Sequence, residues 1–412
     1  MKNNVPDLRF QGFHDQWTLK YLEELAENFI GGGTPKTGVS EYWTGDIPWI
    51  QSSDLIKHKV YGFNSKKSIN DLAIENSTTK IVPKDSIAVV TRVGVGKIAL
   101  FEYQYSTSQD FLSFSKLNID KWFGVYLLYN KMQKELKQVQ GTSIKGITKA
   151  ELLEKKVLIP KINEQIKIGV FFRTLDENIC LHQKELEILK QTKQGFLQKM
   201  FPQEGELVPK IRFSEYKSEW KSIKLSNLTT LFTDGDWIES KDQSEEGIRL
   251  IQTGNIGISK FLNKPGKEKW ITEETFKKLK CQEIYAGDIL ISRLPEPAGR
   301  ACILPSLDTR TITAVDCTII RVDDNSSSEF LLQYLSTNQY FNVVKSYLGG
   351  GTRQRISRSV LGDLIVRVPK ELTEQVKIGE FFKQLDEVID LKEQELDALK
   401  QTKQGFLQKM FV

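Results

Sequence analysis

Several loops of this chain combine glycine, hydroxyl, amide and cationic side chains in a pattern suited to nucleic acid. Residues 31–36 read Gly-Gly-Gly-Thr-Pro-Lys, and residues 349–358 read Gly-Gly-Gly-Thr-Arg-Gln-Arg-Ile-Ser-Arg. Arginine pairs with guanine and glutamine or asparagine with adenine, whereas lysine and bare backbone amides bind phosphates. A single loop of this kind is more often a solvated turn. Similar loops at matching places in both halves of the chain favour a DNA interface.

The candidate DNA-binding residues follow apolar, strand-like runs or lie beside glycines. In the first half of the chain they are Thr34, Lys36, Gln51, Ser52, Arg92, Lys97, Thr142, Ser143 and Lys145. In the second half they are Trp237, Gln252, Asn255, Arg293, Arg300, Thr352, Arg353, Gln354, Arg355 and Arg358. Gln252, Asn255 and Gln354 are the expected base readers, and the lysines the expected phosphate contacts.

The sequence lacks the usual motifs for catalysis. Residues 94–97, Gly-Val-Gly-Lys, do not have the spacing of a GxxxxGK[ST] phosphate loop, and there is no GxGxxG after a strand, no HExxH and no CxxC. Neither the Asn-Pro-Pro-aromatic nor the Asp-Pro-Pro-aromatic tetrapeptide of amino-methyltransferases occurs. The three histidines stand in unrelated contexts and predict no metal site. We therefore expect a non-catalytic chain that binds no cofactor, with any chemistry carried out by a partner.

Composition indicates a globular protein of two or three domains, because the chain has 412 residues, of which 39% are hydrophobic and 27% charged. With 58 basic and 53 acidic residues the net charge is only +5, too small to identify a nucleic-acid binder from totals. No apolar run reaches the roughly 20 residues of a membrane span. The N-terminus lacks the apolar stretch of a signal peptide, and the four cysteines are sparse, so we expect a cytoplasmic protein with reduced thiols and no membrane partner.

An internal duplication organises the chain. Residues 164–201 align without a gap with residues 374–411, and 27 of the 38 positions are identical. A fainter repeat precedes each copy: Trp17 matches Trp220 in similar surroundings, and Thr91-Arg92 matches Ser292-Arg293 after apolar runs. Two diverged units are therefore each followed by a nearly identical segment.

The repeated segment is predicted to be a long helix, because its apolar residues recur at alternating steps of four and three. Such a stripe is typical of a coiled coil and needs a partner. The partner is either the other copy, which we expect to pair antiparallel, or a second chain in a dimer. The seam residues are Ile168, Phe172, Leu175, Ile179, Leu186, Leu189, Phe196, Ile378, Phe382, Leu385, Ile389, Leu396, Leu399 and Phe406.

Each diverged unit is predicted to be an α/β domain with short strands. Strand-like runs cover residues 47–51, 86–91, 97–101 and 156–159 in the first unit, and residues 248–253, 288–293, 301–304, 317–322 and 364–368 in the second. Helices are expected over residues 122–139 and 329–348, and a capping box at residues 148–151 predicts a further short helix. The predicted boundaries are 1–160 and 206–370 for the domains and 161–205 and 371–412 for the helices. The fold class is therefore two tandem α/β domains separated by two long helices packed as an antiparallel coiled coil, with pseudo-two-fold symmetry.

These features resemble the specificity subunit of type I restriction–modification enzymes over essentially the whole chain. The resemblance is carried by Glu-Gln-x-Lys-Ile-Gly-x-Phe-Phe…Leu-Asp-Glu at 164–177 and 374–387, and by the shared Leu-Lys-Gln-Thr-Lys-Gln-Gly-Phe-Leu-Gln-Lys-Met-Phe ends. It is also carried by Gly-Gly-Thr-Pro with Gly-Asp-Ile-Pro-Trp-Ile at 45–50, and by Gly-Asp-Ile-Leu-Ile-Ser-Arg at 287–293. The second unit departs from the pattern, with Asp-Gly-Asp-Trp at 234–237 in place of Gly-Gly-Thr-Pro.

The resemblance implies two target-recognition domains that read a split, asymmetric sequence in double-stranded DNA. It implies that the helices dock two modification subunits, which bind S-adenosylmethionine and methylate adenine. Two restriction subunits, which use ATP and Mg²⁺ and cut DNA, are implied as further partners.

Unequal domains and equal helices agree with this resemblance, because unequal domains should read unequal half-sites and equal helices should meet equal partners. With domain centres about one DNA turn, ~10 base pairs, apart, we expect an unread gap of roughly 5–8 base pairs. An insertion after Phe201 should lengthen this gap. The alternative is a coiled-coil adaptor whose globular ends bind proteins, which would lack the steep salt dependence of DNA binding.

Overall fold

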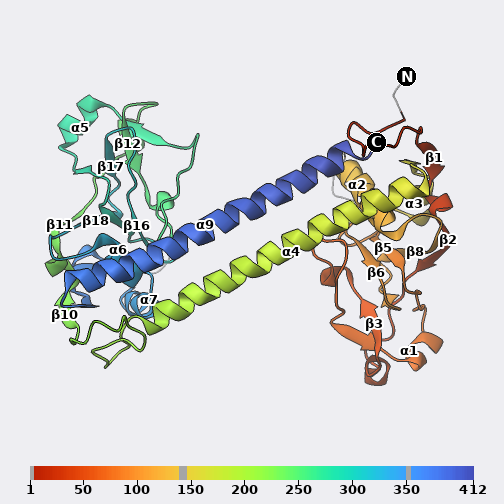
Figure 1. Cartoon of the computed structure of the whole chain (residues 1–412), viewed down its shortest axis with the longest axis horizontal. Helices are drawn as coiled ribbons and strands as arrows, with labels where there is room; N and C mark the ends of the chain where they lie inside the picture. The colour runs from red at the N-terminus through yellow and green to blue at the C-terminus, as the bar shows by residue number, and fades with distance from the viewer. Residues whose placement is uncertain (1–3, 139–145, 349–353) are drawn as a thin grey trace. The chain divides into compact units, whose positions relative to one another are not determined.

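The computed structural model describes residues 4–138, 146–348 and 354–412, and the chain forms two compact units (Figure 1). One unit comprises residues 1–183 and 394–412, and the other comprises residues 184–393. Each unit therefore contains one α/β domain together with one part of each long helix. The predicted class, two tandem α/β domains with two long antiparallel helices, is confirmed.

The first domain is built mainly on two sheets and one long helix, and the first and last of its strands form a third, two-stranded sheet. Its elements are β1 Thr18–Tyr21, β2 Ala26–Gly31, β3 Ile47–Ile50, β4 Lys67–Ile69, α1 Asp71–Glu75, β5 Ser86–Val90, β6 Ile98–Phe101, β7 Ser106–Thr107, β8 Phe111–Leu117, α2 Lys121–Gln138, α3 Lys149–Leu153 and β9 Lys156–Ile159. The larger sheet is antiparallel in the order β2-β8-β5-β6, and the smaller has the order β4-β3-β7. Helix α2 packs against β5 and β6 and buries Phe123 and Tyr126 in the core (Figure 1).

The second domain repeats this plan with other side chains. Its elements are β10 Lys221–Lys224, β11 Thr229–Asp234, β12 Ile248–Ile251, β13 Lys269–Ile271, α5 Glu273–Leu279, β14 Glu283–Ile284, β15 Ile289–Ser292, β16 Ala301–Ile303, β17 Thr311–Thr313, β18 Cys317–Val322, α6 Ser328–Tyr334, α7 Asn338–Ser346, α8 Arg358–Asp363 and β19 Ile365–Val368. The sheet β11-β18-β15-β16 corresponds to β2-β8-β5-β6, and β13-β12-β17-β14 corresponds to the smaller sheet. Both smaller sheets contain a parallel pair, β3 with β7 and β12 with β17.

The prediction of a single helix over residues 329–348 is wrong, because the structure has two helices there, α6 and α7. The chain leaves the helical path at Ser336 and Thr337, whose hydroxyl groups bond to the backbone. Ser336 Oγ donates to the carbonyl oxygen of Leu332 at 2.8 Å, and Thr337 Oγ1 accepts from the amide of Tyr340 at 3.3 Å. Hydroxyl residues that cap a new helix in this way interrupt the preceding one.

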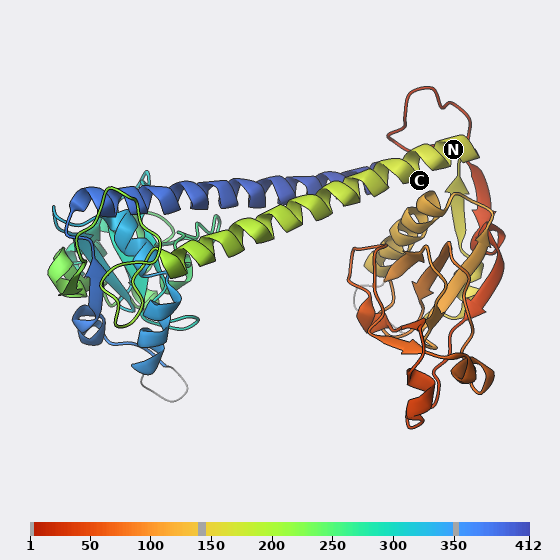
Figure 2. The same cartoon turned by 60° about the horizontal axis from the view of Figure 1, so that its bottom comes forward.

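The two long helices, α4 (Ile162–Lys199) and α9 (Leu372–Lys409), are each uninterrupted in both views (Figures 1 and 2). Every predicted seam residue is buried or partly buried. In the first unit the ring of Phe171 lies 5.0 Å from that of Phe406, and in the second unit Phe196 lies 5.1 Å from Phe381. The early part of each helix thus packs antiparallel against the late part of the other, so the stripe is covered within one chain.

A buried ion pair joins each domain to the start of its helix. Arg9 Nε and Nη2 donate to the two carboxylate oxygens of Glu164 at 2.6 and 2.7 Å. Arg212 makes the same pair of bonds to Glu374, also at 2.6 and 2.7 Å. Bidentate pairs fix direction as well as distance. The two clamps therefore give both domains the same attachment to their helices.

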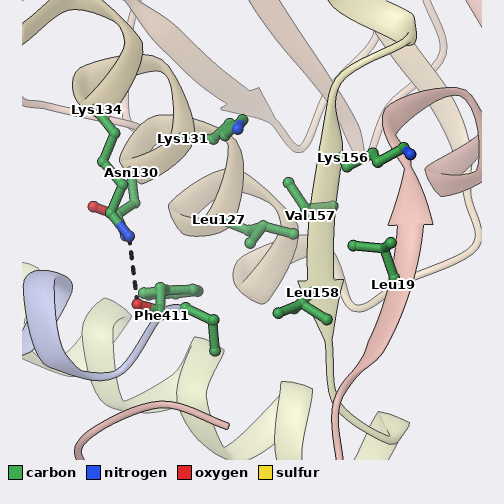
Figure 3. A pocket seen from close by; sticks show the side chains of 10 residues that line it. Leu19, Leu127, Asn130, Lys131, Lys134, Lys156, Val157, Leu158 and Phe411 are labelled. Carbon is green, nitrogen blue, oxygen red and sulfur yellow. Dashed lines mark hydrogen bonds between the residues drawn. The ribbon is translucent and has the colours of Figure 1, made fainter. Parts of the chain in front are cut away.

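The end of α9 forms part of the first domain's core (Figure 3). The Phe411 side chain is buried, with its ring 5.6 Å from those of Phe123 and Phe172. Lys134 Nζ donates to the carbonyl oxygen of Phe411 at 3.5 Å. A cavity of about 140 Å³ beside this contact is lined by Leu127 and Val157 among others. The cavity therefore lies where the end of the chain packs against the first domain.

Candidate DNA interface

The two described DNA-binding loops predicted in the first domain, residues 31–36 and 91–97, meet at one end of its larger sheet. The amide of Gly33 donates to the carbonyl oxygen of Thr107 at 2.9 Å, which ties the Gly-Gly-Gly-Thr loop to the segment before β8. The amide of Ile147 donates to the carbonyl oxygen of Thr91 at 2.7 Å, which places the segment after the third loop beside the end of β5. These two loops and the segment that follows the third, distant in sequence, therefore converge. The predicted residues Thr142, Ser143 and Lys145 lie outside the described residues.

We call this end of the sheet, with its loops, the DNA-facing edge of the domain. Lys36 and Arg92 are exposed there, as a DNA contact requires. Thr34 is partly buried and its hydroxyl bonds to the side-chain oxygen of Gln109. Two tryptophans outside the predicted DNA-binding set support this loop. Trp49 Nε1 donates to the carbonyl oxygen of Gly33 at 3.0 Å, and Trp43 Nε1 to that of Lys36 at 3.3 Å.

A short 3-10 turn follows β3 in the first domain, at Ser52–Asp54, and β12 in the second, at Thr253–Asn255. The amide of Gln51 donates to Asp54 Oδ2 at 2.9 Å, and the amide of Gln252 to Asn255 Oδ1 at 3.0 Å. The side chains of Gln51 and Gln252 therefore leave equivalent backbone positions, partly exposed and exposed respectively. Gln51 thus stays a candidate DNA contact, and Gln252 a candidate base reader.

Two predicted cations, Lys97 and Arg300, hold these turns in place. Lys97 Nζ donates to the carbonyl oxygen of Ser52 at 2.8 Å, and Arg300 Nη2 to that of Thr253 at 2.8 Å. Arg300 also donates to the carbonyl oxygens of Ile256 at 2.6 Å and Leu294 at 2.8 Å, and burial lowers its pKa. With its guanidinium engaged by backbone carbonyls, Arg300 is placed as a structural clamp and not as the predicted DNA contact.

The predicted role of Asn255 as a DNA contact is corrected for a similar reason. Its Oδ1 accepts the amide of Gln252 and its Nδ2 donates to the carbonyl oxygen of Leu262 at 3.0 Å. An adenine is read through the same two atoms of an asparagine, so these internal bonds compete with base contacts. The structure therefore gives Asn255 a turn-forming role.

Five described residues of the predicted set lie at the corresponding end of the second domain's sheet, and they differ in exposure. Trp237 is 70% exposed, and Arg355 and Arg358 are exposed. Arg293 is buried, which excludes direct base contact in this conformation and corrects its prediction as a DNA contact. Gln354 is exposed, whereas Thr352 and Arg353 lie outside the described residues. Two carboxylates outside the predicted DNA-binding set, Asp234 and Asp316, lie among the arginines.

Hydrogen bonds also correct the match between the two domains by one residue. The amide of Arg293 donates to the carbonyl oxygen of Asp316 at 2.9 Å, as that of Thr91 does to Asp110 at 2.7 Å. Thr91 is therefore equivalent to Arg293, and not to Ser292 as the sequence suggested. The loops differ in length, so the sequence alone did not fix this register.

The described residues contain no group of three or more potential ligands that could hold a metal ion. Within residues 4–138, 146–348 and 354–412, no helix combines the length and apolarity that crossing a bilayer requires.

Comparison with known proteins gives the family. The family model described as type I restriction modification DNA specificity domain matches residues 14–191 and 217–401. The chain therefore belongs to this family, and each matched segment covers one α/β domain with most of its helix. This agrees with the duplicated plan of the fold.

Curated relatives match to different extents. The MjaVIII specificity subunit of Methanocaldococcus jannaschii is 25% identical over 403 residues, covering 95% of this chain and 91% of the relative. The MjaIX specificity subunit of the same organism is 31% identical over 182 residues, 42% of this chain and 41% of that protein. The EcoR124I/EcoR124II specificity subunit of Escherichia coli is 30% identical over 169 residues, 39% of this chain and 41% of that protein. The last two matches thus span less than half of each relative.

A solved structure shares the fold along the whole chain. It is the S subunit of a type I restriction–modification system from M. genitalium, with 18% identity, a TM-score of 0.62 and 99% of both chains covered. Together with the family match, this assigns the chain to the DNA-specificity component of type I restriction–modification systems.

Proposed function

We propose that this chain reads a bipartite, asymmetric site in double-stranded DNA, with one half-site for each α/β domain and no catalysis of its own. The observation that carries the proposal is the contrast between the two DNA-facing edges. Their backbones make the same hydrogen bonds, yet Thr91 in the first domain is replaced by Arg293 in the second. Gly32 and Gly235 occupy matching positions, since their amides donate to the first residues of β8 and β18 at 3.3 and 2.9 Å. One scaffold with different side chains supports two different half-sites.

The helices support a proposal about partners. Their pairing repeats the same contacts in both units, and their sequences are nearly identical. Equal surfaces suit equal partners, so we assign two modification subunits to them, with two restriction subunits able to join. S-adenosylmethionine, ATP and Mg²⁺ would be bound by those subunits, because this chain carries none of the sequence motifs for them.

The proposed unread gap is roughly 5–8 base pairs, from one DNA turn between domain centres. An insertion after Phe201 tests this length less directly than expected, because α4 ends at Lys199 and Phe201 is fully buried in the second domain's core. We therefore place the insertion inside the helices. One additional heptad after Gln183 and another after Glu393 preserve the apolar stripe and add about 10 Å. The gap should lengthen, and an unchanged gap would contradict the proposal.

The DNA-binding claim itself is tested by salt. The full chain, mixed with a pool of random-sequence duplexes, should bind in a salt-dependent manner, because cations that contact phosphates displace condensed counterions. The affinity should fall steeply between low and moderate salt. A chain that failed to bind duplex DNA at low salt, alone or with its modification subunits, would favour the adaptor alternative.

A further inference from the structure

A chain of alternating charges crosses the DNA-facing edge of the second domain. We call Arg358, Asp234, Arg293, Asp316 and Arg355 the charge network. Arg358 Nε lies 4.0 Å from Asp234 Oδ2, and Arg293 Nε lies 3.4 Å from Asp234 Oδ1. On the other side, Arg293 Nη2 and Arg355 Nη1 each lie 4.0 Å from Asp316 Oδ1. Two carboxylates thus link one central arginine to two outer ones.

The centre of the network is buried. The side chain of Arg293 is only 8% exposed, and its Nη2 donates to the carbonyl oxygen of Val315 at 2.6 Å. A buried cation is unfavourable unless it is paired with an opposite charge. Asp234 supplies that charge and is itself held, because its Oδ1 accepts from Thr318 Oγ1 at 3.0 Å. The position of the Asp234 carboxylate is therefore determined by the core of the domain.

Exposure increases outward along the network. The side chains of Asp234 and Asp316 are 23% and 33% exposed, whereas those of Arg358 and Arg355 are 46% and 63% exposed. The outer arginines can therefore reach a ligand, while the carboxylates behind them stay largely covered by the protein. The two aspartates are thus placed to support the outer arginines, which form the contact surface.

The first domain has no equivalent of this network among its described residues. The amide of Ile356 donates to the carbonyl oxygen of Arg293 at 3.2 Å, as that of Ile147 does to Thr91. Arg355 consequently matches Gly146, and Asp234, which precedes Gly235, matches Gly31. The network is thus built on backbone positions that both domains share. Asp316 has a counterpart in Asp110, whereas Arg293 and Asp234, like Arg355, have none in the first domain.

We propose that Asp234 and Asp316 are positioning residues that orient Arg358 and Arg355 toward the DNA of the second half-site, with Arg293 anchoring both carboxylates. This inference rests on the proposed function. An arginine that reads guanine must present its planar guanidinium in one orientation, and a free side chain loses rotamer freedom on doing so. A carboxylate at about 4 Å restricts that freedom before DNA arrives. Exposed pairs of this length are weak, so the carboxylate orients the guanidinium without withholding it from the base.

The test uses the full chain expressed with its modification subunits, and reads methylated adenines across the host genome. For each half-site we compare methylation at the preferred sequence with methylation at sequences that differ by one base. In Asp234→Asn and Asp316→Asn this preference should fall about tenfold at one half-site, the size of one good base contact, and stay unchanged at the other. Asp324→Asn is the matched control, because Asp324 is exposed beyond the opposite end of β18.

Coupling separates positioning from folding. In an Arg355→Ala background, Asp316→Asn should cause no further loss of preference, because its effect acts through Arg355. Additive losses, an unchanged preference in both asparagine variants, or a uniform change in methylation at all sites with the base preference kept would each overturn the inference. A wild-type chain that gives no bipartite motif would instead refute the proposed function.

Discussion

The ammonium group of Lys193 lies 2.5 Å from the carboxylate of Asp386, and the same contact recurs at 2.5 Å between Lys403 and Asp176. The two pairs are related by the duplication, since each residue of one pair is 210 positions from its counterpart in the other. Each pair joins the late part of one long helix to the early part of the other. Each carboxylate also accepts a hydrogen bond from a side chain of the adjacent domain. Asp176 accepts from the hydroxyl of Tyr126, and Asp386 from the side-chain amide of Gln333. The pairs therefore fix helix to helix and helix to domain at once.

Asp176→Asn should destabilise the first unit by about 3 kcal/mol, because it leaves the nearly buried ammonium group of Lys403 without a counter-charge. Asp386→Asn should cost less, since Asp386 is 30% exposed against 15% for Asp176. Urea unfolding followed by circular dichroism of the helices measures both. Glu177→Gln is the control on the same helix, because its pair with Arg173 is exposed and should be worth less than about 1 kcal/mol. Equal losses in all three variants would contradict the account.

The thiols should differ sharply in reactivity. Cys180 is exposed, whereas Cys281, Cys302 and Cys317 are buried. Burial raises the pKa of Cys281 to about 11 and that of Cys302 and Cys317 to about 12, so little thiolate forms near neutral pH. A thiol reagent should modify one cysteine rapidly in the native protein and all four in denaturant. Rapid native modification of a second cysteine would show that the interior of the second domain is not packed as described.

Arg355→Ala should relax base preference at one half-site only, by about 1–3 kcal/mol for a lost bidentate contact. Arg92→Ala, which removes an exposed arginine at the corresponding edge of the first domain, should affect the other half-site. Methylation of sites that differ by one base measures both variants. Equal losses at both half-sites from either variant would point to a folding defect instead of a lost contact.

Arg300→Met should weaken the second domain by about 2 kcal/mol, because it leaves several backbone carbonyl groups without their donor. Lys97→Met in the first domain should cost less, because Lys97 donates to a single carbonyl, that of Ser52. Thermal unfolding of the two variants gives the comparison. A stable Arg300→Met protein that had lost only DNA affinity would restore the original interpretation of Arg300 as a DNA contact.

The helices and several strands could be predicted from sequence, because they depend on patterns that repeat between neighbouring residues. The helices, their seam and the strands β9 and β18 followed from periodicity, and the Thr148 cap from a single box, in which Thr148 Oγ1 accepts from the amide of Glu151 at 3.2 Å. β8 was missed because two of its buried positions, Ser113 and Ser115, are polar and hide the apolar pattern.

The sorting of the candidate DNA residues could not be predicted, since it depends on contacts between distant segments. Lys97 and Arg300 resemble surface cations in sequence, and only the fold brings each onto the turn that it holds. No role for Asp234 or Asp316 could be predicted from sequence, because each carboxylate matters here only through the buried Arg293 that it meets.

The central claim is that two unequal domains on equal helices specify a split DNA site. The most direct test is the set of methylated adenines in the host genome, determined with and without this gene. We predict a bipartite, asymmetric motif with an unread gap of roughly 5–8 base pairs that disappears when the gene is deleted. A continuous motif, two identical half-sites, or a motif that survives the deletion would contradict the account.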